Sequence, residues 1–188
     1  MRLFIAVPLP QPLADSALAL QARLKRRFSS GVKWTSPAQF HLTLHFLGEV
    51  EEGRLDALKE LLRRTAGRPC FEIALQGAGA FPSLQRPQVL WAGVADAGSG
   101  LSALHELLKP ELQAQGFAVE NRPFKSHLTL GRVKNAPPPG LAEALKKEAS
   151  DAVSPAAPVQ SVELLESRLS PSGPEYAIVS NVRLGEKI

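Results

Sequence analysis

The tetrapeptide His-Leu-Thr-Leu occurs twice in this chain, at residues 41–44 and 127–130, and the two copies begin 86 residues apart. Polar and apolar residues alternate within it, and threonine favours strands, so each copy is predicted to be a β-strand. The histidine and the threonine then point to one face of the strand and the two leucines to the other. Each copy therefore packs its leucines in a core and presents an imidazole and a hydroxyl, about 6.5–7 Å apart, on the opposite face.

Two copies carry more weight than one, because a single His-x-Thr on a half-buried strand is more often exposed to solvent than catalytic. One copy lies in each half of the chain, which indicates two similar lobes. If an approximate twofold axis relates the lobes, the two His-Thr pairs face each other across one cleft. A solenoid is disfavoured, since the period is long and only two copies exist.

The remaining segments alternate between helical and strand patterns. Apolar residues recur at helical spacing over residues 12–28, and further helices are predicted over 54–65, 101–115 and 141–149, the third of them broken or kinked at Pro110. Strands are predicted over residues 2–7, 40–48, 70–81, 89–94, 123–133, 162–170 and 176–184, the last two as a hairpin with a loop of four or five residues. This alternation predicts an α/β or α+β fold, and we expect residues 1–188 to form one bilobal domain.

Composition sets outer limits on the class of protein. Cys70 is the only cysteine, so no intrachain disulfide is possible, and we expect a reducing, cytoplasmic location with Cys70 packed in the core. No apolar run reaches the roughly 20 residues of a membrane span. We interpret the opening segment MRLFIAVPLP as a first strand rather than a signal peptide, because it carries two prolines and no cleavage site follows.

Paired imidazoles and hydroxyls suit displacement at phosphorus. An imidazole serves as acid or base near neutral pH, so one histidine can take a proton from the incoming nucleophile while the other gives a proton to the leaving oxygen. The hydroxyls of Thr43 and Thr129 can donate hydrogen bonds to the phosphate oxygens. The formal net charge of +4 permits a nucleic-acid partner, and the window from 121 to 142 holds four basic residues and no acidic one.

A metal site is the main competing interpretation. His41 and His45 have the spacing of a zinc-binding helix, but the glutamate of that motif is missing. On a strand the two residues lie roughly 13 Å apart, too far to share one zinc ion. We therefore expect neither a metal nor a cofactor. His45 is predicted to line the edge of the cleft or to lie in solvent, the first being favoured, and His105 is predicted to lie at the surface.

Five segments together resemble a known family, the 2H phosphoesterase superfamily. Within it the chain is similar to the bacterial and archaeal RNA 2′,3′-cyclic phosphodiesterases, also called 2′-5′ RNA ligases of the LigT/ThpR type. The two HLTL copies carry the likeness to the superfamily, and the flanking residues carry the narrower one. The segments are RLFIAVPLP, VKWTSPAQFHLTLHFLG, RPQVLWAGV, RPFKSHLTLGRVK and LLESRLSPSGPEY.

The resemblance implies a bilobal fold in which antiparallel sheets line a central cleft and the helices lie outside. It implies hydrolysis of an RNA-terminal 2′,3′-cyclic phosphate to a 2′-phosphate, with a weak, ATP-independent 2′-5′ ligation as the reverse reaction. His41 would be the proton donor and His127 the proton acceptor, and Thr43 and Thr129 would hold the phosphate. This assignment of acid and base comes from the resemblance alone, because the two motifs are nearly symmetric. The partner would be RNA with a cyclic-phosphate or 2′-phosphate end, and we expect a monomer.

Substrate-binding residues are predicted around the two motifs. Arg132 matches the arginine that follows the second motif in the family, although strict alternation would aim it at the core unless Gly131 permits a bulge. Lys125 and His45 are further candidates. Aromatic residues either stack on a terminal base or pack in the core, and these are Trp34, Phe46, Phe81 and Tyr176. Two alternatives stay open: a phosphodiesterase acting on a small cyclic nucleotide or a 2′-5′-linked oligonucleotide, and a non-catalytic RNA-end-binding module.

Overall fold

The computed structural model describes residues 1–120, 122–171 and 173–185. The strands are β1 (Arg2–Pro8), β2 (Val32–Trp34), β3 (His41–Glu49), β4 (Phe71–Pro82), β5 (Pro87–Ala95), β6 (His127–Val133), β7 (Ala157–Val159), β8 (Ser161–Ser170) and β9 (Gly173–Arg183). The α-helices are α1 (Gln11–Arg27), α2 (Leu55–Arg63), α3 (Gly100–Ala114) and α4 (Leu141–Ala149), and two short 3₁₀ helices are η1 (Pro37–Gln39) and η2 (Glu52–Arg54). The fold is therefore α+β.

Two antiparallel sheets organise the chain. The first sheet has four strands in the order β3-β1-β8-β9, and the second has five in the order β2-β6-β5-β4-β7. β3 pairs with β1 in the first sheet as β6 pairs with β5 in the second, so the two His-Leu-Thr-Leu strands have corresponding partners. They differ in that β3 lies at the edge of its sheet, whereas β6 also pairs with the short β2. β3 and β6 also contact each other, which brings the two motifs to the junction of the sheets.

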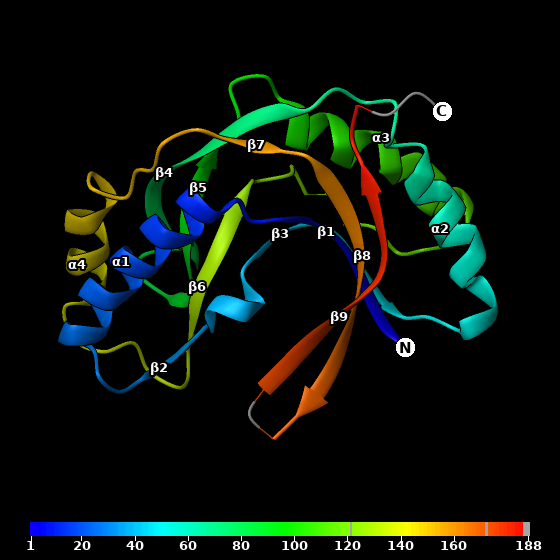
Figure 1. The fold of residues 1–188 in the computed structure, drawn as a ribbon. Coiled ribbons are helices and arrows are strands. Elements are labelled where there is room, and N and C mark those ends of the chain that lie inside the picture. The colour runs from blue at the N-terminus through cyan, green and yellow to red at the C-terminus, as the bar shows by residue number, and fades with distance from the viewer. Residues whose placement is uncertain (121, 172, 186–188) are drawn as a thin grey trace.

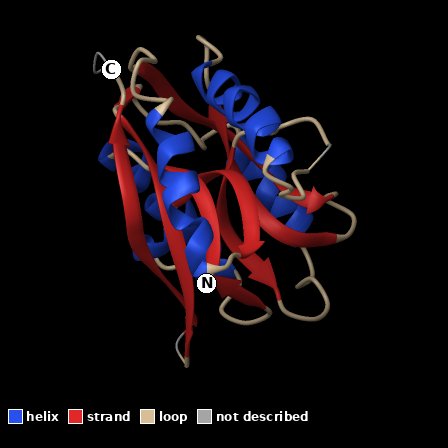
Figure 2. Cartoon of the chain, turned by 90° about the vertical axis from the view of Figure 1, so that its right-hand side faces the viewer, coloured by secondary structure: helices blue, strands red, loops and turns tan. Residues whose placement is uncertain are grey.

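The helices cover the outer sides of the two sheets. In Figure 1 the sheets curve into an arch, with α1 and α4 against the second sheet and α2 and α3 against the first. Figure 2, turned by 90°, shows the helices lying against the strands. Helix packing follows the apolar periodicity: α1 begins with a proline in its first turn and buries Leu13, Ala17, Leu20 and Leu24. No helix in the described ranges is long and apolar enough to cross a lipid bilayer.

The leucines of both motifs lie in the main core, as predicted. Leu42, Leu44, Leu128 and Leu130 are each at most 5% exposed. β1 shows the same division of faces, because Leu3, Ile5 and Val7 join the main core, whereas Phe4 and Ala6 belong to a separate apolar cluster on the opposite face with Leu165. The first sheet therefore has one face buried under helices and one face that carries His41.

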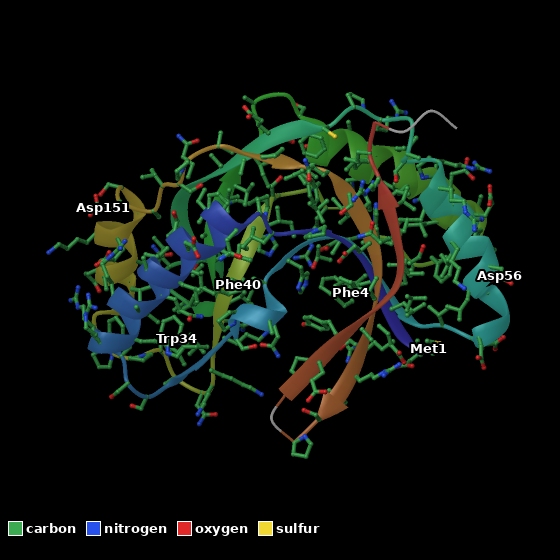
Figure 3. All side chains as sticks on the ribbon, in the orientation of Figure 1. Met1, Phe4, Trp34, Phe40, Asp56 and Asp151 are labelled. Carbon is green, nitrogen blue, oxygen red and sulfur yellow. The ribbon has the colours of Figure 1, made fainter. Side chains whose placement is uncertain are left out.

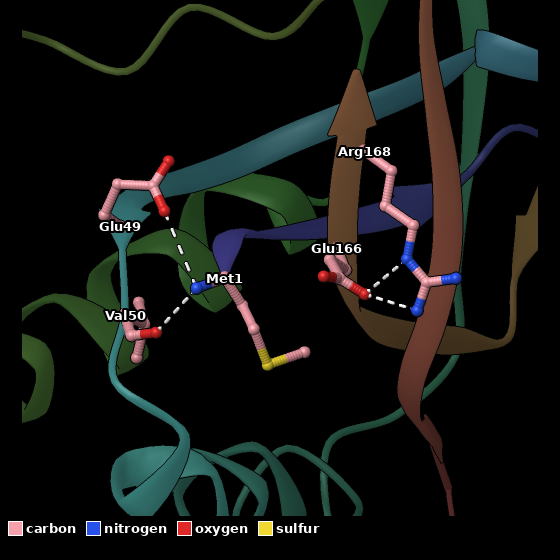
Figure 4. A network of polar contacts seen from close by, with 5 residues as sticks. All are labelled: Met1, Glu49, Val50, Glu166 and Arg168. Atoms are coloured by element: carbon pink, nitrogen blue, oxygen red, sulfur yellow. Dashed lines mark hydrogen bonds and ion pairs between the residues drawn. The ribbon is translucent and has the colours of Figure 1, made fainter. Parts of the chain in front are cut away.

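Polar contacts hold the first sheet together at the beginning of β1. The ammonium group of Met1 donates to the carbonyl of Val50 at 2.9 Å and lies 3.6 Å from the carboxylate of Glu49 (Figure 4). In the same view Arg168 contacts Glu166 through Nε at 2.8 Å and Nη2 at 2.7 Å. The first contact ties the start of β1 to the end of β3, two strands whose register places His41.

The predicted elements are largely confirmed, with local differences. β2 and β7 were not predicted, because three residues are too short to show an alternating pattern. α3 continues through Pro110, since its buried leucines, among them Leu104, Leu108 and Leu112, hold the helix against the loss of one hydrogen bond. In the final hairpin β8 ends at Ser170 and β9 begins at Gly173, so the strands extend further toward each other than the predicted loop of four or five residues would allow.

Two single-residue predictions are wrong. Cys70 is exposed rather than in the core, because it lies in the connecting segment just before β4 and not within the strand. His105 was predicted to be at the surface, yet it is only 4% exposed on the buried face of α3.

Candidate active site

His41 begins β3 on the face opposite the helices. Its Nδ1 donates to the carbonyl oxygen of Gln39, two residues upstream, at 2.7 Å. The ring lies between two aromatic side chains: the centroid of Phe4 is 4.8 Å away, and Tyr176 meets it edge-on at 5.0 Å. Gln39 is the last residue of η1, so a local turn fixes the acceptor that orients His41.

His127 is held in the same way at the start of β6. Its Nδ1 donates to the carbonyl oxygen of Lys125, again two residues upstream and again at 2.7 Å. Phe81 of β4 meets the ring edge-on, with centroids 4.9 Å apart. Both histidines therefore share one hydrogen-bond pattern and one kind of aromatic neighbour, as two equivalent strands would produce.

The hydrogen bond at Nδ1 determines what the rest of each ring can do. A backbone carbonyl only accepts, so Nδ1 carries a hydrogen in both the neutral and the charged ring. The proton that is gained or lost must then sit on Nε2. No residue within the described ranges forms a hydrogen bond to Nε2 of His41 or His127. Each ring therefore offers a proton acceptor when neutral and a proton donor when charged.

Burial lowers the pKa of both imidazoles. For His41 it outweighs the hydrogen bond to Gln39 and, together with the charge of His127, lowers the pKa from 6.5 to about 4. For His127 burial again comes first, and the charges of Lys125 and Arg132 lower its pKa further. Because the charge of His127 acts on His41, the two rings lie within electrostatic reach of each other.

A bulge in β6 decides where Arg132 points. In the pairing with β5, Trp91 lies opposite Thr129 and Leu90 opposite Gly131, so Leu130 has no partner residue. The carbonyl of Leu130 instead accepts from the backbone N–H of Thr35 at 3.0 Å and from the buried Gln21 amide at 2.9 Å. A bulge of the kind that Gly131 was expected to permit is therefore present, one residue earlier at Leu130, and the unpaired carbonyl of Leu130 is satisfied.

The bulge turns the side chain of Arg132 to the histidine face. Arg132 is exposed, and its charge lowers the pKa of both His127 and Tyr176. These two residues come from different sheets, so the charge of Arg132 acts on groups of both sheets. A strictly alternating strand would have pointed Arg132 toward the core.

β3 carries the same irregularity, and it overturns the predicted place of His45. In the pairing with β1, Ala6 lies opposite Thr43 and Ile5 opposite His45, so Leu44 is skipped. The bulge turns His45 into the core, where it is 4% exposed, and turns Phe46 to the histidine face, where it is 65% exposed. His45 therefore lies away from the substrate-facing side.

Of the two roles predicted for Trp34, base stacking and core packing, the structure favours core packing. Trp34 shares the core side of β2 with Val32, and the ammonium of Lys25 from α1 lies 5.9 Å from its ring centroid. Figure 3 shows Trp34 beside α1, well separated from Phe4. The neighbouring Lys33 lies opposite Arg132 in the β2–β6 pairing and is exposed on the other side of the strand. Lys33 was not predicted as a site residue.

Aromatic side chains flank the histidines on both sheets. On the first sheet Phe4 contacts Phe46, at 6.0 Å between centroids, and Tyr176, at 4.9 Å. On the second sheet Phe81 and Trp91 lie under the ammonium of Lys125, which is 5.4 Å and 4.5 Å from their ring centroids. Phe4 and Trp91 were not predicted. Both residues lie on the strands that pair with the two motifs, and the sequence alone does not show which strands pair.

Metal ligands do not gather in the part of the chain that the structure describes. No group of three or more His, Cys, Asp or Glu side chains there is arranged to hold a metal ion. The four polar side chains of the motifs, with Lys125 and Arg132, remain the chemically distinctive group on this face.

The LigT-like phosphoesterase family model matches the chain twice, over residues 7–91 and 93–176. Each match places its histidine 34 residues after its start, from 7 to 41 and from 93 to 127. The chain belongs to the LigT-like phosphoesterase family. The double match also confirms that the tetrapeptide marks an internal repeat about half the chain in length.

Relatives of known name agree with this membership. A protein of Archaeoglobus fulgidus named RNA 2′,3′-cyclic phosphodiesterase is 36% identical over 176 residues, which are 94% of this chain and 96% of the relative. One of the same name from Thermotoga maritima is 35% identical over 182 residues, 95% of this chain and 93% of the relative.

Solved structures share the fold over nearly the whole length. TT0787 of Thermus thermophilus superposes with a TM-score of 0.81 at 31% identity and full coverage of both chains. Escherichia coli LigT in complex with 3′-AMP gives a TM-score of 0.77 at 26% identity over 98% of each chain. Together they confirm the predicted bilobal phosphoesterase fold.

Proposed function

We propose that this LigT-like phosphoesterase hydrolyses the 2′,3′-cyclic phosphate at the end of an RNA and leaves a 2′-phosphate. The observation that carries the proposal is the matched anchoring of two imidazoles, each fixed through Nδ1 and each open at Nε2, on equivalent strands of the two sheets. The names of the relatives support the class of substrate.

The proposed reaction moves two protons across one phosphorus atom. Nε2 of His127 accepts a proton from water while the water oxygen forms a bond to phosphorus. The bond from phosphorus to the ribose O3′ breaks on the opposite side, and Nε2–H of His41 donates its proton to that oxygen. The product carries a 2′-phosphate and a free 3′-hydroxyl. Each ring ends in the protonation state opposite to its starting one, and exchange with solvent resets the pair.

The charges around the two rings favour this direction. Lys125 and Arg132 disfavour a positive charge on His127, which keeps it a base. Among the groups that act on the pKa of His41, the only positive charge is that of His127. A bound anionic phosphodiester therefore restores much of the proton affinity that burial removes from His41. On this assignment, the bound phosphodiester is what allows His41 to hold the proton that the leaving oxygen needs.

The remaining side chains on this face would bind the substrate. We assign to Thr43 and Thr129 hydrogen bonds to the non-bridging phosphate oxygens, where charge grows in the transition state. Arg132 adds a charged fork and Lys125 a point charge. Phe46 and Tyr176, which pack on the buried Phe4 next to His41, would lie on the side of the leaving oxygen and suit stacking of the terminal base.

A weak ligation follows from the same arrangement. If the 5′-hydroxyl of a second RNA replaces water, His127 deprotonates it and a 2′-5′ bond forms without ATP. Water is far more abundant than RNA ends, so hydrolysis dominates. The mechanism requires no metal, because the imidazoles move both protons and the side chains above carry the phosphate charge.

The direct test uses an RNA oligonucleotide with a 2′,3′-cyclic phosphate end, incubated in EDTA, with the product read by ³¹P NMR. We expect a 2′-phosphate. A 3′-phosphate would contradict the assigned leaving oxygen, and loss of all turnover in EDTA would contradict metal independence. Faster turnover of a cyclic mononucleotide than of the oligomer would point to a small nucleotide as substrate. Binding without turnover would leave only an RNA-end-binding module.

A further inference from the structure

Three aromatic rings form a stack between the two motifs. His45 of β3 stacks on His105 of α3, with centroids 4.2 Å apart and planes 17° from parallel. His105 in turn stacks on Phe124, at 4.6 Å and 21°. Nε2 of His45 donates to the backbone carbonyl of His105 at 2.9 Å. Both histidines are 4% exposed, and neither belongs to the face where the proposed chemistry takes place.

The stack ends one residue before the group that orients His127. Phe124 precedes Lys125, whose carbonyl accepts the Nδ1 hydrogen of His127 at 2.7 Å. The next residue, Ser126, accepts a backbone hydrogen bond from Val94 at 3.3 Å. The segment from 124 to 126 is therefore held at one end by a partly buried ring that packs against the core and at the other by β5.

The first motif has no need of such a stack. The acceptor for His41 is Gln39, which closes the 3₁₀ turn η1, and the Gln39 side chain accepts from the backbone N–H of Ser36 at 3.0 Å. In the second motif residues 123–126 belong to no helix or strand, so no local turn holds the carbonyl of Lys125. The support must then come from elsewhere in the chain: the stacked ring of Phe124 provides it on the N-terminal side, beside the Val94–Ser126 hydrogen bond and the contacts of Lys125 with Phe81 and Trp91.

We propose that His105 is a positioning residue: its ring, clamped between His45 and Phe124, sets the place of the Lys125 carbonyl and through it the orientation and proton affinity of His127. The inference rests on the proposed role of His127 as proton acceptor. His105 acts at a distance and touches no substrate. The stack also links β3, which carries the first motif, to the segment that leads into the second.

The test compares His105→Ala with His105→Phe by NMR titration of the histidine ring protons. The hydrogen bond to the Lys125 carbonyl favours the charged ring of His127, so loosening it lowers the pKa of His127 further. We expect this fall in His105→Ala and in Phe124→Leu. We expect none in His105→Phe, which keeps a ring in the stack. The pKa of His41 stays unchanged in all three, because its acceptor lies in η1.

Leu108→Ala is the matched control, since it also removes a buried side chain from α3 but lies outside the stack. Three outcomes would overturn the proposal. The first is a His127 pKa that falls as far in Leu108→Ala as in His105→Ala. The others are a His127 pKa that is unchanged in His105→Ala or lowered in His105→Phe. Turnover of the cyclic-phosphate RNA provides the second readout. We expect kcat to fall roughly 10–100-fold in His105→Ala at nearly constant KM, and His105→Phe to restore it. The titration tests the positioning role of His105 even if the proposed reaction is wrong. Failure of the positioning role can therefore be distinguished from failure of the proposed function.

Discussion

His41 and His127 are held by the same hydrogen bond, from Nδ1 to the carbonyl two residues upstream, at 2.7 Å in both cases. The sequence separation is 86 residues, yet the local geometry repeats. Since the bond leaves only Nε2 to exchange a proton, each ring has one defined direction for acid or base chemistry.

The first prediction concerns the loss of either imidazole. His41→Ala and His127→Ala should each lower kcat by roughly 10²–10⁴-fold, the usual size of acid or base catalysis. The measurement is single-turnover hydrolysis of a cyclic-phosphate RNA, with circular dichroism to confirm folding. Leu108→Ala serves as a comparison, because Leu108 is buried on α3 and lies outside both motifs and the stack. A folded His41 or His127 variant with unchanged turnover would remove that residue from the mechanism.

The second prediction is an acidic optimum for kcat/KM. The reaction needs one protonated and one neutral imidazole, and both pKa values lie below 6.5, that of His41 near 4. Above both values the singly protonated pair becomes about tenfold rarer with each pH unit. We therefore expect kcat/KM to decline through neutrality, whereas kcat peaks at higher pH because bound phosphate raises both pKa values. A kcat/KM profile that is flat from pH 5 to pH 8 would contradict the lowered pKa values.

The third prediction separates the charge of Arg132 from its shape. Arg132→Ala should lower kcat/KM roughly 10–100-fold through lost charge-assisted hydrogen bonds. It should also raise the pKa of His127, because in the unmodified protein the positive guanidinium disfavours the charged form of that ring. Arg132→Lys keeps the charge but loses the two-pronged geometry, so the pKa of His127 should stay low while kcat/KM recovers only in part. NMR titration and steady-state kinetics on both variants provide the two measurements.

The alternation of polar and apolar residues was sufficient to place both motifs on strands and their leucines in the core. It failed beyond the fourth residue of each motif, because a bulge at Leu44 and another at Leu130 reverse the alternation. Arg132 and Phe46 then face the histidines while His45 enters the core. A bulge depends on the partner strand and on the groups that satisfy its free carbonyl, such as Gln21 on α1. These are tertiary contacts that no local pattern contains.

The fourth prediction tests that support of the bulge. Gln21 is 1% exposed and donates to the carbonyls of Leu130 and Thr35 at 2.9 Å and 2.8 Å. Gln21→Met keeps the volume but removes both hydrogen bonds, so the free energy of unfolding should fall by roughly 1–3 kcal/mol in urea denaturation. The exposed Gln11→Met is the control and should change it little. If Gln21 stabilises the bulge, kcat/KM falls as well, because the side chain of Arg132 no longer points to the histidine face.

The fifth prediction links the buried His45 to acid stability. Burial lowers its pKa from 6.5 to about 4, so between these values the unfolded chain binds a proton that the folded protein does not. Stability contributed by the neutral ring is therefore present above pH 6.5, is lost as the pH falls toward 4, and changes no further below that. The loss is roughly 2 kcal/mol after allowance for solvent screening.

His45→Phe removes this proton while keeping a ring against His105. We expect the variant to be less stable than the unmodified protein at pH 7, where it lacks the hydrogen bond to the carbonyl of His105, by about 1 kcal/mol. The difference should shrink or reverse at pH 4, because only the unmodified protein has lost stability through His45. Urea denaturation at the two pH values measures this. A difference that is equal at pH 7 and pH 4 would show that the imidazole of His45 titrates alike in the folded and unfolded chain.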